Sequence, residues 1–163
     1  MAESQPFVEW LAGAVDCLQA SLQDGSAKVK WNACYATGSL ASNSGLREIV
    51  STNGTLPLLI SLLVHLINEN PNFKVQMQAA AAMENIPERD SFKETFLLAI
   101  SAVARRLHIL QDGSQEALPE GDAQTELIQP TVDASFPNFK YHEGLKHQLE
   151  STLMHLLSLL EDR

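Results

Sequence analysis

The sequence predicts an all-α protein, a right-handed α-solenoid of about three helical hairpins and six helices. Apolar residues recur at helical spacing in six segments, and no segment alternates between apolar and polar residues as a strand does. One stripe of small and apolar residues returns twice along the chain, which is typical of helical repeats. The 163 residues, 45% apolar and 19% charged, suffice for a single domain that covers residues 1–163.

The breaks between helices follow turn-forming residues. The stretches 42–45 (SNSG) and 51–54 (STNG) are expected to interrupt the helical pattern. Ser91 and Glu94 have the spacing of a capping box for the fifth helix, and the third helix is apolar nearly all round, which predicts deep burial. The helices expected in chain order are 7–22, 27–42, 55–69, 72–86, about 91–111 and 138–160.

The repeat lies in the second, fourth and sixth helices. Each copy follows another helix, so the unit is a helical hairpin, and the three hairpins cover about 6–42, 55–87 and 90–160. Spacings of four, three and four residues place each stripe on one helix face, which we expect to be turned toward the core. The aligned stripes are Val29, Ala33, Ala36 and Leu40, then Val75, Ala79, Ala82 and Ile86, then Leu145, Leu149, Thr152 and Leu156.

An acidic insert at 112–135 lengthens the third hairpin. It holds six of the 20 acidic residues, no Lys or Arg, and two prolines, Pro119 and Pro130. Such a composition disfavours regular structure and predicts a flexible loop. Both a solvated insertion and a docking arm for a basic partner fit this composition.

Three segments carry a resemblance to a known family: KVKWNACYATGSL at 28–40, NFKVQMQAAAAM at 72–83 and NFKYHEGLKHQLESTLMHLLSLL at 138–160. Together they resemble HEAT repeats, which are armadillo-like, and most specifically the C-terminal region of the HEAT repeat-containing protein 6 family. The resemblance implies a HEAT-repeat domain that acts as an interaction scaffold. It implies no catalytic residues and no cofactor.

The surface of the second helices is the predicted binding face, because stacked repeats leave a long groove there. With the stripes turned inward, the opposite helix faces carry Trp31, Tyr35, Met77, Ala81, Glu84, His147, Ser151 and Met154, and Gly38 also points outward. Trp31, Tyr35 and Met77 form a candidate anchoring patch for a protein partner of unknown identity. The alternative is that Trp31 contacts further repeats of a longer parent chain.

Composition bears on the partner and on the compartment. The net charge of −9 disfavours nucleic acid as a partner, and the chain lacks the apolar run of about twenty residues that a membrane span needs. Lys28, Lys30 and Lys74 cluster near helix starts, as a solvated edge or as a contact for phosphate or an acidic peptide. Cys17 and Cys34 are interpreted as reduced, buried thiols of a cytoplasmic or nuclear protein without a secretory signal.

Histidine spacing does not favour an enzyme. His142, His147 and His155 lack the i, i+4 pairing of a helical metal site, and His65 in its apolar helix is interpreted as a core or interface histidine. We therefore expect no catalytic, metal or cofactor site and a protein-protein interaction scaffold. The alternative is an importin-like adaptor that recognises basic peptides through acidic surface, and its binding should weaken more steeply with salt.

Overall fold

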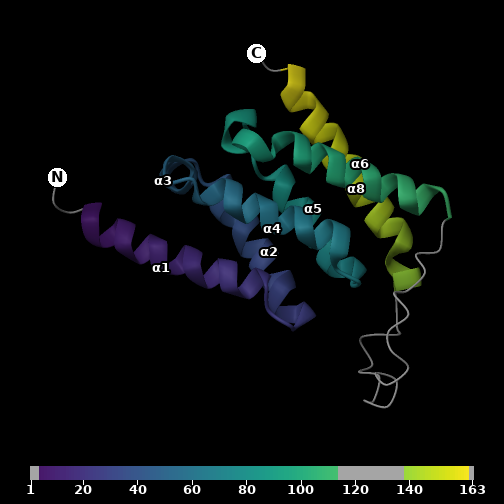
Figure 1. Cartoon of the computed structure of the whole chain (residues 1–163), viewed down its shortest axis with the longest axis horizontal. Helices are drawn as coiled ribbons and strands as arrows, with labels where there is room; N and C mark the ends of the chain where they lie inside the picture. The colour runs from purple at the N-terminus through teal and green to yellow at the C-terminus, as the bar shows by residue number, and fades with distance from the viewer. Residues whose placement is uncertain (1–3, 114–137, 162–163) are drawn as a thin grey trace.

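The structure, a computed structural model, describes residues 4–113 and 138–161 (Figure 1). These residues form seven α-helices and two short 3₁₀-helices, with no strand among them, so the predicted all-α class is confirmed. The elements are α1 (Ser4–Leu22), α2 (Ala27–Ser42), α3 (Ser44–Thr52), α4 (Thr55–Glu69), α5 (Phe73–Glu84), η1 (Arg89–Ser91), η2 (Lys93–Thr95), α6 (Phe96–Gln111) and α8 (Asn138–Glu161).

Most of the predicted acidic insert, from 114 to 135, lies outside the described residues. Its first residue, Asp112, follows the last turn of α6, and its backbone N–H donates to the carbonyl of His108. The imidazole of His108 lies 3.2 Å from the Asp112 carboxylate. Helix α6 therefore ends at Gln111, and Asp112 is the residue that caps it.

Helix α3 was not predicted. The turn-forming residues read as breakers delimit this helix: the Asn43 side chain accepts a hydrogen bond from the Leu46 N–H at 3.0 Å. Two α3 side chains, Arg47 and Val50, are buried. Asn caps helices as readily as it forms turns, so the same residue type marks a helix start here.

The capping box predicted for the fifth helix is absent. Ser91 is buried at the end of η1, Glu94 lies in η2, and Thr95 precedes α6 without a side-chain cap bond. Phe92 and Phe96 are buried edge-to-face with ring centroids 5.4 Å apart. Where the first turn of the helix was expected, the chain forms two 3₁₀ turns, and the two phenylalanine rings are buried there.

The second helices of the predicted hairpins form one layer. Helix α5 packs against α2 on one side and α8 on the other, while α4 packs against α5 and α6, and α1 packs against α2. Figure 1 shows α1 and α8 at opposite sides of the molecule with α4 and α5 between them. One face of α5 is therefore flanked by α2 and α8.

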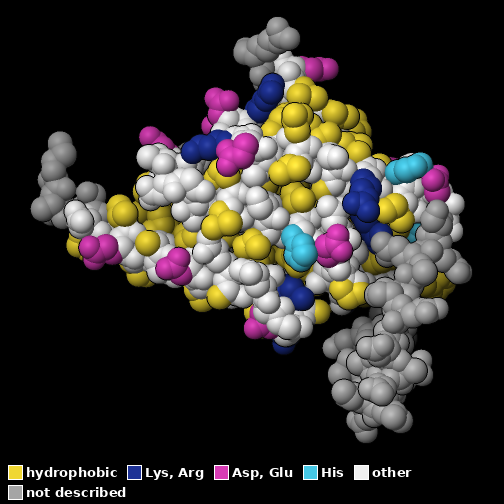
Figure 2. Space-filling view, in the orientation of Figure 1, with side chains coloured by type: hydrophobic (Ala, Val, Ile, Leu, Met, Phe, Trp, Pro, Cys, Tyr) yellow, Lys and Arg dark blue, Asp and Glu magenta, His cyan; other side chains and the backbone are white. Residues whose placement is uncertain are grey.

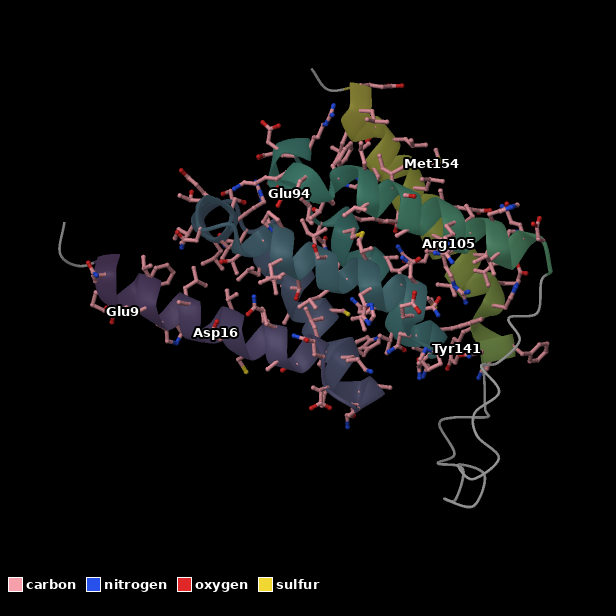
Figure 3. All side chains as sticks on the ribbon, in the orientation of Figure 1. Glu9, Asp16, Glu94, Arg105, Tyr141 and Met154 are labelled. Carbon is pink, nitrogen blue, oxygen red and sulfur yellow. The ribbon has the colours of Figure 1, made fainter. Side chains whose placement is uncertain are left out.

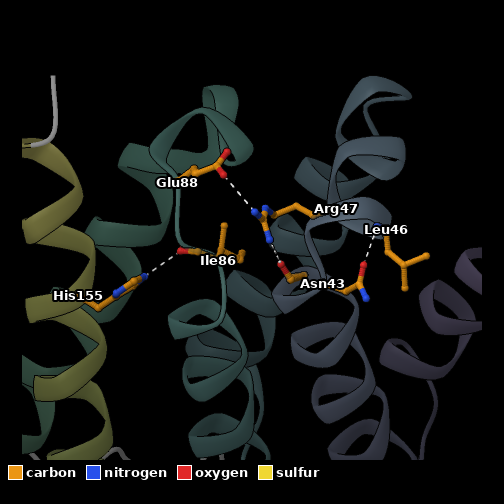
Figure 4. Close-up of polar contacts among 7 residues, drawn as sticks. Asn43, Leu46, Arg47, Ile86, Glu88 and His155 are labelled. Atoms are coloured by element: carbon orange, nitrogen blue, oxygen red, sulfur yellow. Dashed lines mark hydrogen bonds and ion pairs between the residues drawn. The ribbon is translucent and has the colours of Figure 1, made fainter.

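Helices α5 and α8 run in the same direction, as polar contacts at both ends show. At the N-terminal ends, the Asn138 side chain accepts a hydrogen bond from the Phe73 N–H at 3.1 Å and donates to the Pro71 carbonyl at 2.7 Å. At the C-terminal ends, His155 Nε2 lies 2.9 Å from the Ile86 carbonyl oxygen (Figure 4). These contacts fix the register of α8 on α5.

The predicted stripes on α5 and α8 are buried. Every member of both stripes is buried, as are Ala33 and Leu40 on α2, whereas Ala36 is half-buried. Val29, in contrast, is 37% exposed, so its predicted core position is wrong.

Gly38 explains the difference on α2. It was predicted to point outward but is buried, and a Cβ atom built on it would lie 3.1 Å from Ala82 Cα. Helix α2 therefore meets α5 closely at Gly38, and Ala33 and Ala41 are also buried, whereas Val29 in the first turn is left near solvent.

Burial also differs from prediction at two further positions. Helix α4 is deeply buried through seven residues as predicted, but His65 on it is exposed, because the helix keeps one solvent-facing side with Ser61 and Glu69. Cys34 is buried as predicted and Cys17 is exposed. Burial raises the pKa of the Cys34 thiol to about 12.

A buried polar link joins α6 to α5 and to the turn before α5. The Arg106 Nε–H donates to the Gln76 side-chain oxygen at 2.7 Å, and the Gln76 amide donates to the Asn70 carbonyl. The Arg106 guanidinium also lies over the Phe73 ring, 5.3 Å from its centroid.

Among the described helices, none alone is long and apolar enough to cross a membrane, and only α3 and α4 together, across a bend of 96°, reach that length and composition.

Candidate partner-binding groove

An open groove of about 610 Å³ lies over α5 between α2 and α8. We call it the α5 groove. Its walls come from the start of α2, where Ala27 lies, from α5 and its cap Asn72, and from the N-terminal half of α8. The lining side chains include Lys28 and Trp31 of α2, Lys74, Met77, Gln78 and Ala81 of α5, and Tyr141 and Gln148 of α8.

Three of the predicted binding residues line this groove: Trp31, Met77 and Ala81. Trp31 stacks on Tyr35, one turn further along α2, with ring centroids 6.2 Å apart and an interplanar angle of 5°. Trp31 is 40% exposed and Tyr35 is 60% exposed. The two rings therefore form an exposed aromatic surface at the edge of the groove, as the helical spacing predicted.

Met77 forms the floor of the groove. It is half-buried against the core, and a Cβ atom on Gly144 of α8 would lie 3.2 Å from Met77 Cε. Gly144 thus leaves room for the methionine between α5 and α8. A thioether in this position can adjust to the shape of an incoming side chain.

Glu84, one of the predicted binding residues, forms hydrogen bonds within the protein. Its carboxylate accepts hydrogen bonds from Gln148 Nε2 at 2.8 Å and from Thr152 Oγ1 at 2.9 Å. Thr152 Oγ1 also lies 3.2 Å from the Ala80 carbonyl oxygen. Glu84 therefore links α5 to α8 through one carboxylate oxygen, Oε1.

The remaining predicted residues lie on α8. His147, Ser151 and Met154 are exposed, and none of them lines the α5 groove. Met154, 73% exposed, is labelled in Figure 3 well beyond Tyr141 along α8. Figure 2 shows apolar side chains gathered near that C-terminal part of α8. The structure therefore divides the predicted face into the groove and a separate α8 surface.

Two features of the groove were missed: the place of Tyr141 and the side on which each lysine lies. Lys74 Nζ lies over the Tyr141 ring, 4.7 Å from its centroid. A side-chain hydrogen bond with Lys74 holds the pKa of Tyr141 below its ordinary value. The tripeptide Asn-Phe-Lys, at 72–74 and again at 138–140, marks the starts of α5 and α8 and was the available signal.

No group of three or more His, Cys, Asp or Glu side chains able to hold a metal ion occurs in residues 4–113 and 138–161. His142 lies 3.4 Å from the neighbouring Glu143 carboxylate, and His108 pairs only with Asp112 among the described residues.

The chain is 28% identical, over 158 residues that cover 88% of it, to a protein of Dictyostelium discoideum described as uncharacterized. The matched region spans 9% of that protein's length. No protein-family model matches the chain. No solved structure matches it either.

Proposed function

We propose that this chain is a non-enzymatic protein-protein interaction scaffold that binds partners along the face formed by α2, α5 and α8. The observation that carries the proposal is the exposed Trp31–Tyr35 stack at the edge of the open groove over α5. Aromatic side chains next to a concave apolar surface are favoured at the centres of protein interfaces.

The same proposal includes a HEAT-like, right-handed α-solenoid. The layer of α2, α5 and α8, with α1, α4 and α6 packed behind it, supports a stack of helical hairpins in chain order. The buried stripes on α5 and α8 support the repeat alignment. In such stacks each hairpin completes the core of the next one, and the second helices line a continuous surface.

The importin-like alternative gains no support from the α5 groove. Recognition of basic peptides there needs carboxylates, but the part of the lining that the structure describes includes Lys28 and Lys74 and no acidic residue. Any capture of basic peptides would have to use another part of the surface.

The test is site-specific photo-crosslinking in cells with the full chain. A benzophenone amino acid replaces Tyr35 at the groove edge or, as a matched control, Leu98, which is 58% exposed on α6. We expect discrete crosslinked proteins from position 35 and few from position 98. Equal crosslinking from both positions would contradict a binding face on α2, α5 and α8.

A second measurement separates binding from folding. The double substitution Trp31→Ser and Tyr35→Ser should abolish the capture of those crosslinked proteins. Both rings are substantially exposed, so the helical circular dichroism should stay unchanged. Unaltered capture by this variant would remove the aromatic pair from the proposal.

A further inference from the structure

We propose that the α5 groove binds a short acidic peptide segment of a partner, with an aliphatic or aromatic side chain on Trp31 and Met77 and carboxylates beside Lys28 and Lys74. This inference rests on the proposed scaffold function and names the chemistry of its partner. It is the reverse of the basic peptide that an importin-like adaptor would take.

The charge of the groove is opposite to that of the whole chain. The protein carries a net charge of −9, yet among the described residues the groove lining holds two lysines and no carboxylate. Within the described residues, neither Lys28 nor Lys74 forms an ion pair with a carboxylate. Both lysines are exposed residues, and although the Lys74 ammonium contacts the Tyr141 ring, it can also pair with an incoming carboxylate, as can that of Lys28.

The N-terminal ends of α5 and α8 lie at the same end of the groove as the two lysines. Asn138 joins them directly, and the groove also contacts Ala27 at the start of α2. The first N–H groups of α5 are already bonded to the side chains of Asn72 and Asn138, so Lys28 and Lys74 supply the positive charge for an anion at this end of the groove. The opposite end differs, since the Glu84 carboxylate is bonded to Gln148 and Thr152.

An apolar floor lies next to these charges. Val75 and Ala81 of α5 lie in the lining with Trp31 and Met77. A leucine or phenylalanine seated there would lose contact with water, and apolar burial contributes more affinity than exposed charge pairs do. The volume of about 610 Å³ admits a few side chains and not a folded domain.

These features favour a peptide over a nucleic acid. A polyanionic backbone would meet only two groove lysines before it met the negative remainder of the surface, and phosphate binding strength grows with the number of paired charges. A peptide can place two carboxylates on the lysines and an apolar side chain on the floor.

The test is fluorescence anisotropy of the full chain with a fluorescein-labelled seven-residue peptide, Asp-Asp-Leu-Asp-Phe-Asp-Asp. Three control peptides replace every Asp by Asn, every Asp by Lys, or both apolar residues by Ser. We expect saturable binding of the acidic peptide that weakens as salt rises, and much weaker binding of all three controls.

The protein offers a matched control variant. Lys30 lies on the same helix as Lys28 but lines a different depression, with Leu22, Leu62 and His65. The double substitution Lys28→Ala and Lys74→Ala should weaken peptide binding about tenfold or more, whereas Lys30→Ala should change it by less than about twofold. Trp31→Ala should weaken binding by a similar factor without steepening the salt dependence.

The outcomes are distinguishable. Preferred binding of the lysine peptide, equally tight binding of a labelled oligothymidine, or equal loss in Lys30→Ala would overturn the acidic-peptide proposal. Absence of peptide binding together with persistent crosslinks from position 35 would also overturn it, while leaving the scaffold function in place. Loss of both signals would overturn the two proposals together.

Discussion

At the scale of single residues, Gly38 sets the distance between α2 and α5. It is buried, and an added Cβ would lie 2.8 Å from Asn85 Nδ2 and 3.1 Å from Ala82 Cα. The amide of Asn85 can rotate away, but the α5 backbone at Ala82 has no such freedom. A helix interior usually disfavours glycine, so its presence here reflects close packing.

Gly38→Ala should therefore lower the free energy of unfolding by about 1–3 kcal/mol. The steric clash of the added methyl group with the α5 backbone outweighs the gain in helix propensity of about 1 kcal/mol. Gly13→Ala on α1 is the matched control, since nothing lies within 4 Å of its added Cβ. That variant should gain about 0.5–1 kcal/mol. Urea unfolding of both variants measures the difference, and stabilisation by both would mean that the helices are not in close contact.

Because of Cys34, the free energy of unfolding should depend on pH in the alkaline range. Its thiol has a pKa of about 12 in the folded protein against 9.0 for the ordinary group, because it is buried. Above pH 9 the unfolded chain loses this proton before the folded one, so the free energy of unfolding falls as pH rises from 9 toward 12.

Between pH 9 and pH 10.5 this thiol should remove about 2 kcal/mol from the free energy of unfolding. Cys34→Ala should have a smaller pH slope over the same range, whatever its stability at neutral pH. Urea unfolding at several pH values gives both slopes, and equal slopes would contradict a buried, protonated thiol.

Exposed Cys17 should react quickly with a thiol reagent at neutral pH while Cys34 does not.

Burial of single residues was predicted correctly where helical spacing alone determines it. It was predicted wrongly where the packing of a neighbouring helix determines it. Trp31, Tyr35 and the α5 stripe follow the helical wheel. Val29 and Gly38 do not, because the wheel gives relative directions on α2 but not the angle at which α5 meets it. His65 shows the same limit, since apolar neighbours along the chain do not indicate which side of α4 stays uncovered.

At the scale of elements, the unexpected helix α3 is held by one arginine. Arg47 Nη1 donates to the Ala41 carbonyl at the end of α2 at 2.8 Å, and Nη2 donates to Glu88 at 3.0 Å (Figure 4). Arg47 is mostly buried, whereas the Glu88 side chain is 61% exposed. A nine-residue helix is marginal by itself, so these contacts stabilise it in place.

Arg47→Ala should cost about 1–3 kcal/mol, because it leaves the Ala41 carbonyl without its partner and removes a packed side chain. Glu88→Ala removes only the exposed half of the ion pair and should cost less than about 1 kcal/mol. Hydrogen exchange of the α3 amides should accelerate in the first variant and stay close to normal in the second. Equal effects would mean that the ion pair, and not the carbonyl contact, holds α3.

Sequence patterns gave the positions of the other helices and not that of α3. Asn43 and Gly54 are residue types that serve equally in turns and at helix ends. The choice between them came from Arg47 and Val50, whose burial depends on α2 and on the loop after α5. The failed capping box at Ser91 has the same origin, since burial of Phe92 moved the start of α6.

At the scale of the whole molecule, α8 completes the core. It packs against both α5 and α6, and its Leu149 is fully buried. Both tryptophans, Trp10 and Trp31, lie at the other side of the molecule, on α1 and α2. Their fluorescence therefore reports on the first hairpin, while circular dichroism reports on all helices.

Leu149→Ala should lower the free energy of unfolding by about 2–5 kcal/mol, and Leu157→Ala, which changes a partly exposed residue of the same helix, by less than about 1 kcal/mol. Because α5 contacts both α2 and α8, the Leu149 variant should shift the fluorescence and circular dichroism transitions equally. An unchanged fluorescence transition would show that the hairpins unfold independently.

The pairing of Gly38 with Ala82 has a consequence for the α5 groove, whose walls are carried by the same helices. The angle between α2 and α5 fixes how far Trp31 stands from Tyr141 across the opening, and that angle depends on two of the smallest side chains in the protein. Exchanging small residues in the interior would widen or narrow the opening while every solvent-facing side chain stayed the same. Related proteins that share the same surface residues can therefore differ in the size of the ligand that fits the groove.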